Sequence, residues 1–391
     1  MNVMTPIAAN NEEQEQERLV LDSVDRFLER HVRPVAMQLE HDDEYPAEIV
    51  ERMKELGLFG AVIPAEYGGL GLRPSTYVRI IERIATVWMS ISGIINSHLI
   101  MARIVERMGT EAQKQAFLPR FATGELRGGL ALTEPDAGTD LQAIRTTAKR
   151  DGDDYVVNGT KTWISNGIQG SIFALLVKTD STAEPRHKGM SMLRAEKGSG
   201  FRVGRKLHKL GYKGIDSAEL VFEKYRVPAD RLIGAEGRGM VAALAGLELG
   251  RVNVAARGVG VAQAALDEAV RYSQQRRTFG KPIHEHQAIA LKLGDMATRV
   301  TAARLLTAAA AAALDRGDRS DYEAGMAKLF ATEAAVENAT EAMRIFGGYG
   351  YSKEFIVERL YRDAPLLVIG EGTNEMQRLI IAKRLIERNR I

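Results

Sequence analysis

The segment Tyr155-Val-Val-Asn-Gly-Thr-Lys-Thr-Trp-Ile164 decides the fold class, because here the chain leaves a helical period for short β-type runs. An Asn-Gly pair flanked by β-branched and aromatic residues is typical of a tight hairpin turn. The segment therefore predicts two short strands around Asn158-Gly159. Further strands are expected over Ile172–Val177, Met190–Ala195 and Ala218–Phe222. Short strands without intervening helices favour a small antiparallel barrel or sandwich over residues 128–238.

The sequence before this β segment follows a helical period. Apolar residues recur at three- and four-residue steps from Leu19 to Val32 and make one amphipathic face, which Pro34 then ends or kinks. The Gly-rich stretch Pro64–Leu72 predicts a loop, and the helical pattern resumes from Ser75 to about Met108. We expect an N-terminal helical domain over residues 1–127.

The sequence after the β segment is helical again. Gly317 and Gly347 stand where helix C-terminal stops are expected. Long helices with short connections favour an antiparallel four-helix bundle, here over residues 239–391. The four predicted helices are Met240–Arg276, Glu285–Leu314, Tyr322–Phe346 and Glu375–Glu387.

The composition indicates a globular protein without thiol chemistry. The 391 residues are 45% hydrophobic and 27% charged, with a formal net charge of +2 that argues against a dedicated nucleic-acid binder. Zero cysteines exclude disulfides, thiolate nucleophiles and zinc–thiolate sites. No segment is expected to span a membrane, and an acidic start with Glu12, Glu13, Glu15 and Glu17 is unlike a targeting leader. We therefore expect a cytoplasmic protein.

Familiar catalytic motifs are missing from the sequence. It contains no G-x-S-x-G elbow, no P-loop and no H-E-x-x-H zinc helix. His284 and His286 are two residues apart, a spacing that places them on different faces of a helix. We expect them to be surface residues at a helix start, and we expect no bound metal.

Two stretches of the β segment have the composition of ligand-contacting turns. Leu132-Thr-Glu-Pro-Asp-Ala-Gly-Thr-Asp140 combines small and hydroxyl-bearing residues that let backbone N–H groups approach an anion; an ordinary turn is the alternative. Trp163-Ile-Ser-Asn-Gly167 presents an indole that can stack on a planar cofactor, with a hydroxyl two residues on. On the residues alone, a Trp in the core of the β domain is favoured over a stacking Trp.

The third stretch contains a candidate base. Glu371 lies between two glycines, after the apolar run Leu366–Ile369 and before Gly-Thr-Asn. Glycines leave the carboxylate uncrowded, and apolar neighbours raise its pKa, which suits a general base for a weak carbon acid. The alternative is an acid that caps the final helix. Both roles remain open at this point.

These three stretches, in this order across a helical, a β and a second helical part, resemble the acyl-CoA dehydrogenase family from about residue 19 to residue 388. No single motif carries the resemblance; their shared order does. Supporting motifs are Pro64-Ala-Glu-Tyr-Gly-Gly-Leu-Gly71, Lys209-Leu-Gly-Tyr-Lys-Gly214 and Arg276-Arg-Thr-Phe-Gly-Lys-Pro-Ile-His-Glu-His-Gln287.

The resemblance implies an FAD enzyme that oxidises an acyl-CoA thioester to its trans-2-enoyl form. Glu371 matches the glutamate that takes the α-proton, while the β-hydride goes to N5 of FAD. The substrate carbonyl is expected to accept hydrogen bonds from the Glu371 backbone N–H and a flavin ribityl hydroxyl, which stabilises the enolate. Electron-transfer flavoprotein is the implied electron acceptor. A homotetramer, or at least a dimer, with flavin sites completed between subunits is the implied assembly.

The resemblance also carries individual residues over to this chain. Trp163 and Ser165, with Ile164, match the flavin-ring contacts, and Arg276, Thr278, Phe279 and Gln287 match positions that reach the FAD of a neighbouring subunit. The other matched flavin contacts are Leu132, Thr133, Gly138, Thr139, Arg344, Gly347, Gly348, Thr373 and Glu375. The implied substrate contacts are Thr139, Glu248, Arg251 and Gly372.

Two positions depart from the family pattern. Some relatives carry the base on the earlier helix, at the position that Gly250 occupies here, so this chain cannot use that position. Glu248, nearby, is expected to be a substrate-rim or structural acid. Arg344 stands where many members have a glutamine on the FAD diphosphate; a cation could serve the phosphates there.

Other functions on the same fold remain open. An acyl-CoA oxidase-like enzyme would share the half-reaction, although typical oxidases of this group are much longer. A flavin monooxygenase or nitroalkane oxidase would characteristically lack the glutamate at position 371. A non-catalytic acyl-CoA-binding helical protein is a third alternative, and a colourless purified protein would favour it.

Overall fold

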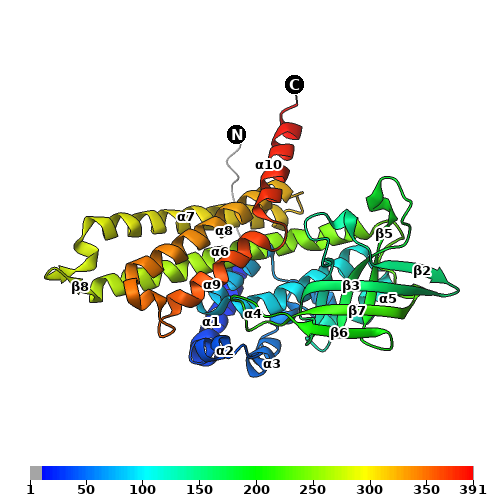
Figure 1. The fold of residues 1–391 in the computed structure, drawn as a ribbon, viewed down its shortest axis with the longest axis horizontal. Coiled ribbons are helices and arrows are strands. Elements are labelled where there is room, and N and C mark those ends of the chain that lie inside the picture. Colours follow the sequence, from blue (N-terminus) through cyan, green and yellow to red (C-terminus); the bar gives the residue numbers. More distant parts are fainter. Residues whose placement is uncertain (1–10, 391) are drawn as a thin grey trace.

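The computed structural model describes residues 11–390; residues 1–10 and Ile391, which belong to the expected terminal domains, lie outside the described residues. The chain forms a helical part, a curled sheet and a second helical part (Figure 1). The helices are α1 (Asn11–Phe27), α2 (Ala36–His41), α3 (Ala47–Glu55), α4 (Pro74–Met108), α5 (Glu111–Ala122), α6 (Gly239–Gln275), α7 (Gln287–Asp315), α8 (Asp321–Phe346), α9 (Ile356–Ile369) and α10 (Asn374–Arg388). The strands are β1 (Gly128–Ala131), β2 (Thr147–Asp151), β3 (Asp154–Ser165), β4 (Ile172–Lys178), β5 (Met190–Glu196), β6 (Phe201–Lys206), β7 (Ser217–Pro228), β8 (Arg277–Thr278) and β9 (Lys281–Pro282).

The first seven strands make one sheet in the order β1-β4-β2-β3-β7-β6, with β5 paired to β4. Most pairs are antiparallel, but β1 and β2 each pair with β4 in parallel, so the expected antiparallel barrel or sandwich is a curled sheet with mixed strand directions. Its concave interior has a core of its own. That core includes Tyr155, Val157, Phe173, Phe201, Phe222 and Val227.

The predicted hairpin at Asn158-Gly159 is wrong. Both residues lie inside the single 12-residue strand β3, where the register against β7 shifts. Asn158 Oδ1 accepts a hydrogen bond from the Lys224 backbone N–H at 2.8 Å, and a Cβ on Gly159 would lie 2.4 Å from the Thr146 hydroxyl. The Asn-Gly pair therefore marks a bulge with close backbone approach. The hairpin turn lies earlier, at residues 152–153 between β2 and β3.

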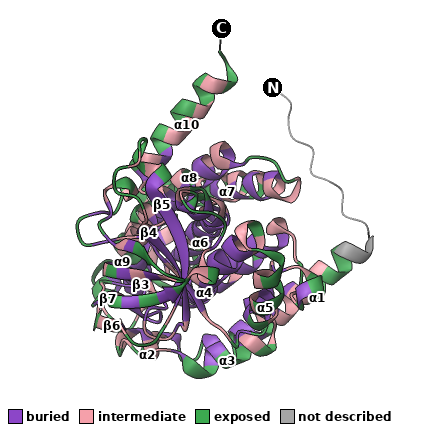
Figure 2. Ribbon diagram, turned by 90° about the vertical axis from the view of Figure 1, so that its right-hand side faces the viewer, coloured by how far each residue is buried: buried purple, intermediate pink, exposed green. Residues whose placement is uncertain are grey.

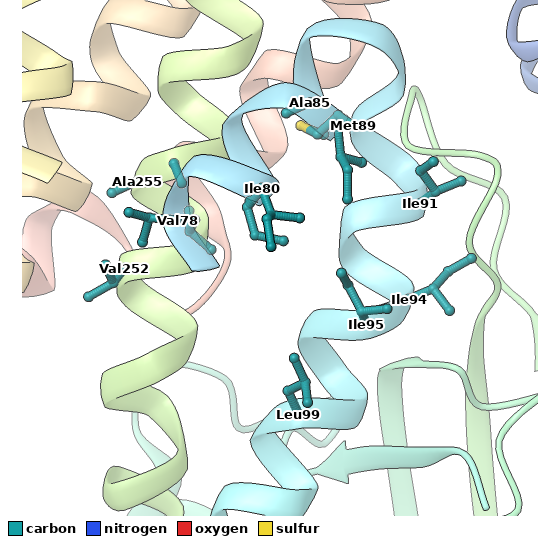
Figure 3. Close-up of a cluster of buried hydrophobic side chains, with 14 of the residues drawn as sticks. Val78, Ile80, Ala85, Met89, Ile91, Ile94, Ile95, Leu99, Val252 and Ala255 are labelled. Atoms are coloured by element: carbon teal, nitrogen blue, oxygen red, sulfur yellow. The ribbon is translucent and has the colours of Figure 1, made fainter. Parts of the chain in front are cut away.

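Helices α4 and α6 form the centre of the main core, which Figure 3 shows with side chains from both. α4 is kinked at Trp88, whose backbone leaves the helical region with φ −157° and ψ 103°. The Trp88 indole N–H donates to the buried Glu40 carboxylate of α2 at 2.8 Å. The kink is therefore anchored by a polar contact to the N-terminal helices, and it lets α4 reach both the sheet and the bundle.

The expectation that no segment is long and apolar enough to span a membrane is wrong by length and composition. Two helices pass that test, Pro74–Met108 and Gly239–Gln275. Within the fold, 89% and 67% of their most apolar windows are buried. Figure 2 shows the corresponding purple interior around α4 and α6, as in the core helices of a globular protein.

The second helical part packs α6, α7, α8 and α9 together, and α10 packs on α8 while its C-terminal end projects from the body (Figures 1 and 2). The four predicted helices are present within two residues at each end. α9 lies in a stretch for which the sequence pattern predicts no element. Its core-facing side includes Arg359 and Asp363, whose burial an apolar pattern does not reveal.

Candidate functional site

Glu371 lies in the short loop between α9 and α10, in a left-handed backbone conformation with φ +57°. Thr373 caps α10, because its side chain accepts a hydrogen bond from the Met376 backbone N–H. The capping role that the sequence left open for Glu371 therefore belongs to Thr373. This arrangement leaves the Glu371 side chain free to enter the core.

The Glu371 carboxylate is buried between α4 and α6. Its Oε1 accepts a hydrogen bond from Asn96 Nδ2 at 3.2 Å. Its Oε2 is buried and has no hydrogen-bond partner in the described part of the chain. A buried oxygen with free lone pairs is costly to maintain, and it is what a proton acceptor must offer.

Gly250 of α6 makes room for this carboxylate. A Cβ at position 250 would lie 2.8 Å from Glu371 Oε2 and 2.9 Å from Ile100 Cδ1. Position 250, where the resemblance implies that some relatives carry their base, thus faces the same spot that Glu371 fills here. One carboxylate fits there, and in this chain it comes from Glu371.

Burial and nearby positive charges shift the pKa of Glu371 in opposite directions. Desolvation raises the pKa of Glu371 above its usual range, and the positive charges of Arg257 and Arg251 pull the pKa part of the way back, with the Asn96 hydrogen bond and Lys328 contributing less. The carboxyl is therefore a stronger base than an exposed glutamate, and nearby cations still favour its ionised form.

The Glu371 backbone N–H donates no hydrogen bond to any described residue. The left-handed conformation orients this group differently from the helices on either side. The candidate base residue therefore also carries a free backbone donor. Gly372 follows, also with positive φ, and is exposed.

The other proposed substrate contacts lie on α6 or in the turn after β1. Arg251 is buried, and its Nε has no hydrogen-bond partner among the described residues. Glu248 is half-buried, and burial raises its pKa. Thr139 is exposed at the end of its turn.

The turn at residues 132–139 is held from beneath by a buried ion pair. Lys161 Nζ donates to the Leu132 carbonyl at 2.9 Å and to Glu134 Oε1 at 2.8 Å. Glu134 also accepts hydrogen bonds from the backbone N–H groups of residues 145 and 146, and the Thr162 N–H donates to the Thr133 carbonyl. Gly138 has no neighbour closer than 4.0 Å to where a Cβ would be. The outer side of the turn is therefore open while its inner side is fixed.

Trp163 lies on the surface, so the interpretation as a core Trp is wrong. Its side chain is 59% exposed, and its φ is +60°, at a register shift of β3 against β7. Ile164 points into the core, and Ser165 is half-buried. A large aromatic residue held exposed in a strained conformation is typical of a ligand-stacking position.

A second group of candidate residues lines a cleft of about 490 Å³ at the far end of the bundle. Arg276, Thr278 and Phe279 come from the β8–β9 hairpin, and Gly347 and Gly348 follow α8. The Phe279 ring is 97% exposed, and no atom lies within 4 Å of where a Cβ would be at Gly347 or Gly348. The cleft combines an arginine, exposed aromatic surface and approachable backbone.

Four remaining candidate residues do not line this cleft. Gln287 begins α7, and Arg344 is exposed with its guanidinium 2.7 Å from Glu341 Oε1. Thr373 and Glu375 belong to the start of α10, beside Glu371 rather than beside the β8–β9 hairpin.

The two groups of flavin candidates, around Trp163 and around Arg276, lie at opposite ends of the folded molecule. The N-terminus of α6 packs on β5, and its C-terminus leads directly into β8. A helix of 37 residues is about 55 Å long, and Figure 1 shows β8 at one end of the molecule and the sheet at the other. One chain does not bring Trp163 and Arg276 to one ligand.

The histidine pair shows no metal geometry. His284 contacts the Ser273 carbonyl, and His286 contacts the Thr278 hydroxyl. Within residues 11–390 no group of three or more His, Asp or Glu side chains is placed to hold a metal ion.

Several site residues were not predicted from the sequence. Asn96, Arg257 and Lys328 surround Glu371, and none belongs to a recognisable motif. Arg257 gave one signal: a charged residue seven positions after Gly250 in an Ala- and Val-rich helix, on the same helical face.

Comparisons with known proteins identify one family over nearly the whole chain. The family models for the N-terminal, middle and C-terminal domains of acyl-CoA dehydrogenase match residues 14–125, 129–225 and 237–386. An acyl-CoA dehydrogenase of Bacillus subtilis (strain 168) is 41% identical, covering 95% of this chain and 98% of the relative.

Solved structures show the same similarity. Butyryl-CoA dehydrogenase from Megasphaera elsdenii superposes with a TM-score of 0.92 at 35% identity, over 98% of this chain and 100% of that one. A chain from a structure described as the electron transferring flavoprotein of Acidaminococcus fermentans gives 0.93 at 35% identity, over 98% and 100% of the two chains.

Proposed function

The chain belongs to the acyl-CoA dehydrogenase family of FAD-dependent oxidoreductases, and from that premise we propose that Glu371 removes the α-proton of an acyl-CoA thioester as the acyl group is oxidised to its trans-2-enoyl form. The α-C–H electron pair becomes the new C=C bond, the proton goes to Glu371, and the β-hydrogen leaves as hydride. When bound, FAD supplies the two-electron acceptor for that hydride.

The observation that carries the proposal is the buried, unpartnered Oε2 of Glu371. Burial raises the pKa of this carboxyl, which brings it closer to that of an activated carbon acid and strengthens it as a base. Asn96 holds the other oxygen, so the side chain is oriented before substrate arrives. The free Glu371 N–H supports a second role, as a donor to the thioester carbonyl where enolate charge develops.

The residues present fit a flavin dinucleotide. Exposed Trp163 offers a stacking face, and the fixed turn after β1 offers open backbone and the Thr133 hydroxyl. The far cleft offers Arg276 for phosphates and unobstructed backbone at Gly347 and Gly348. These are the groups that would hold the ring and the diphosphate, respectively.

A flavin site shared between subunits follows from the separation of these two groups along α6. α10, which packs on α8, also carries apolar side chains that the single chain leaves exposed, Leu379, Leu385 and Ile386. Exposed apolar surface of this kind supports an interface. We extend the proposal to a homo-oligomer, a homotetramer built from such pairs, in the cytoplasm.

Electron-transfer flavoprotein is the proposed acceptor of the electrons. The similarity to a chain in a structure of an electron transferring flavoprotein supports this partner. Flavin reduced anaerobically by substrate should be reoxidised rapidly by electron-transfer flavoprotein and slowly by O₂; rapid turnover with O₂ would instead indicate an oxidase.

Glu371→Gln tests the base directly. The substitution keeps size and polarity and removes the proton acceptor, so flavin reduction by acyl-CoA in an anaerobic rapid-mixing experiment should slow by about 100- to 10,000-fold. The variant should still be yellow and bind acyl-CoA, because the backbone N–H and the flavin contacts remain. Near-normal reduction would show that another group is the base.

A further inference from the structure

Arg257 is a buried arginine whose hydrogen-bond partners are all neutral. Its side chain is 4% exposed; Nε donates to Asn253 Oδ1 at 2.7 Å and Nη1 donates to the Tyr212 hydroxyl at 2.8 Å. Among the described residues, Arg257 forms no ion pair with a carboxylate, and these two hydrogen bonds use its Nε and Nη1 but not its Nη2. A desolvated guanidinium with donors to spare is costly unless an anion completes it.

The position of Arg257 follows from the helix on which it lies. Gly250, Asn253 and Arg257 are at positions i, i+3 and i+7 of α6 and share one face. Gly250 faces the Glu371 carboxylate, so Arg257 lies two turns farther along, about 10 Å beyond the base. An acyl chain whose α-carbon meets Glu371 and which continues along this face would end near Arg257.

Helix α4, which faces α6, also contacts both Glu371 and Tyr212. Asn96 of α4 donates to Glu371, and Gly93, one turn earlier, faces Tyr212. A Cβ at Gly93 would lie 1.4 Å from the Tyr212 hydroxyl oxygen, so this hydroxyl occupies space that only glycine leaves. Tyr212 itself adopts φ +57°. The Arg257–Tyr212 pair is therefore held in place from both helices.

Three cations act on the base, and two of them have further carboxylates nearby. Arg251, Arg257 and Lys328 all act on Glu371, the carboxylate they have in common. Arg251 is also near Glu248, and Lys328 is near Glu333 and Glu375 and donates to Asn374 Oδ1. Arg257 differs from the other two, because both of its hydrogen bonds go to neutral groups and it lies two turns beyond Gly250 on α6.

We propose that Arg257, together with the Tyr212 hydroxyl, binds a carboxylate at the far end of the acyl group, so that the substrates are mono-CoA thioesters of short dicarboxylic acids. This inference rests on the proposed dehydrogenation. A guanidinium forms two parallel hydrogen bonds with a carboxylate, and a methyl-ended acyl group would leave the same buried cation without an anionic partner.

Matched pairs of substrates test the inference on the FAD-loaded enzyme. Glutaryl-CoA and pentanoyl-CoA have equal chain lengths and differ in a terminal carboxylate or methyl, as do succinyl- and butyryl-CoA, and adipyl- and hexanoyl-CoA. In anaerobic flavin reduction, kcat/KM should favour the carboxylate by about 30-fold or more in at least one pair. Arg257→Gln should abolish that ratio, and Arg257→Lys should keep part of it because the charge remains.

Lys328→Met is the control for a purely electrostatic effect on the base. It removes another buried cation that acts on Glu371, so it should change the rates of both members of a pair alike and leave their ratio intact. Flavin content and melting temperature identify any variant that fails to fold, and Arg257→Lys then remains informative.

The outcomes separate this inference from the proposed function. Methyl-ended acyl-CoAs that reduce the flavin as well as their dicarboxylic partners would overturn the carboxylate site and leave the dehydrogenation standing. An Arg257→Gln variant that slows both members equally would do the same. If no acyl-CoA of any class reduces the flavin, the proposed function fails and the inference falls with it.

Discussion

At the level of single residues, Gly250 controls where the Glu371 carboxylate can lie. Gly250→Ala would place a methyl group 2.8 Å from Oε2 and displace the base. A displacement of about 1 Å at a reacting group costs up to about 100-fold in rate, so flavin reduction should slow by about 10- to 100-fold. Gly294→Ala on α7, where a Cβ meets nothing, is the control; it should raise the unfolding free energy by up to about 1 kcal/mol and leave flavin reduction normal.

The pH dependence of flavin reduction should report the Glu371 environment. A base must be ionised to act, and burial raises the pKa of Glu371, so the rate should begin to fall on acidification at a higher pH than for an exposed glutamate. Removing a nearby cation disfavours the carboxylate and raises its pKa further.

Lys328→Met should therefore move this acid limb to higher pH, and Lys149→Met, on the exposed face of β2, should not move it. An acid limb that stays in place in Lys328→Met, or that matches an ordinary glutamate in the parent enzyme, would contradict the environment assigned to Glu371. Rapid-mixing rates across pH 4 to 9, about the range in which carboxyl groups and histidines titrate, provide the measurement.

Single residues also show what the sequence could and could not predict of the site. Glu371 stands out because glycines flank it and an apolar run precedes it. Asn96 and Arg257 do not, because each is a lone polar residue in a long apolar helix, and its role depends on which loop packs opposite. Only tertiary contact brings them to the carboxylate.

Among the elements, the turn after β1 depends on the ion pair beneath it. Lys161→Met would leave Glu134 buried without its cation and the Leu132 carbonyl without its donor. Breaking a buried pair from one side costs about 3–5 kcal/mol, so the unfolding free energy should fall by that order and FAD should be retained less well. Equilibrium denaturation and flavin content after dialysis measure both effects.

The double variant Lys161→Met/Glu134→Gln is the matched test of that explanation. It removes the stranded charge while an amide oxygen can still accept from the N–H groups of residues 145 and 146. It should recover part of the lost stability. A double variant as unstable as Lys161→Met would mean that the lysine stabilises the turn by packing alone.

The elements were predictable where periodicity extends over many residues and unpredictable where tertiary contact reassigns a local signal. α7 and α8 follow from long helical patterns that end close to Gly317 and Gly347. Asn158-Gly159 carries the signal of a hairpin, but packing against Thr146 and pairing with β7 turn it into a bulge. The parallel β1–β4 pair joins segments 44 residues apart in register, which no local pattern encodes.

For the whole molecule, a flavin site shared between chains can be tested by complementation. Trp163→Ala and Arg276→Ala should each lower flavin retention, because each removes one half of every site. When the two variants are unfolded and refolded together, a mixed pair recombines an intact Arg276 half with an intact Trp163 half at one of its two sites. Flavin content and activity of the mixture should rise above those of either variant alone.

The same experiment can also contradict a flavin site shared between chains. If one chain builds the whole site, mixing gives only the average of the two variants. Refolding each variant with wild-type chain calibrates the yield of mixed pairs, and a yellow, fully active monomer at low concentration would contradict sharing independently.

The length of α6 has a thermodynamic consequence. A rigid helix of about 55 Å holds the two half-sites apart, so no chain can fold back and close a site on itself. For the shared flavin site proposed above, retention of the cofactor should obey mass action in protein concentration as well as in flavin concentration. Chain association would strengthen flavin binding by a certain free energy. By thermodynamic linkage, flavin binding would strengthen chain association by the same free energy. With a shared site, the fraction of chains that carry flavin should therefore rise with total protein concentration.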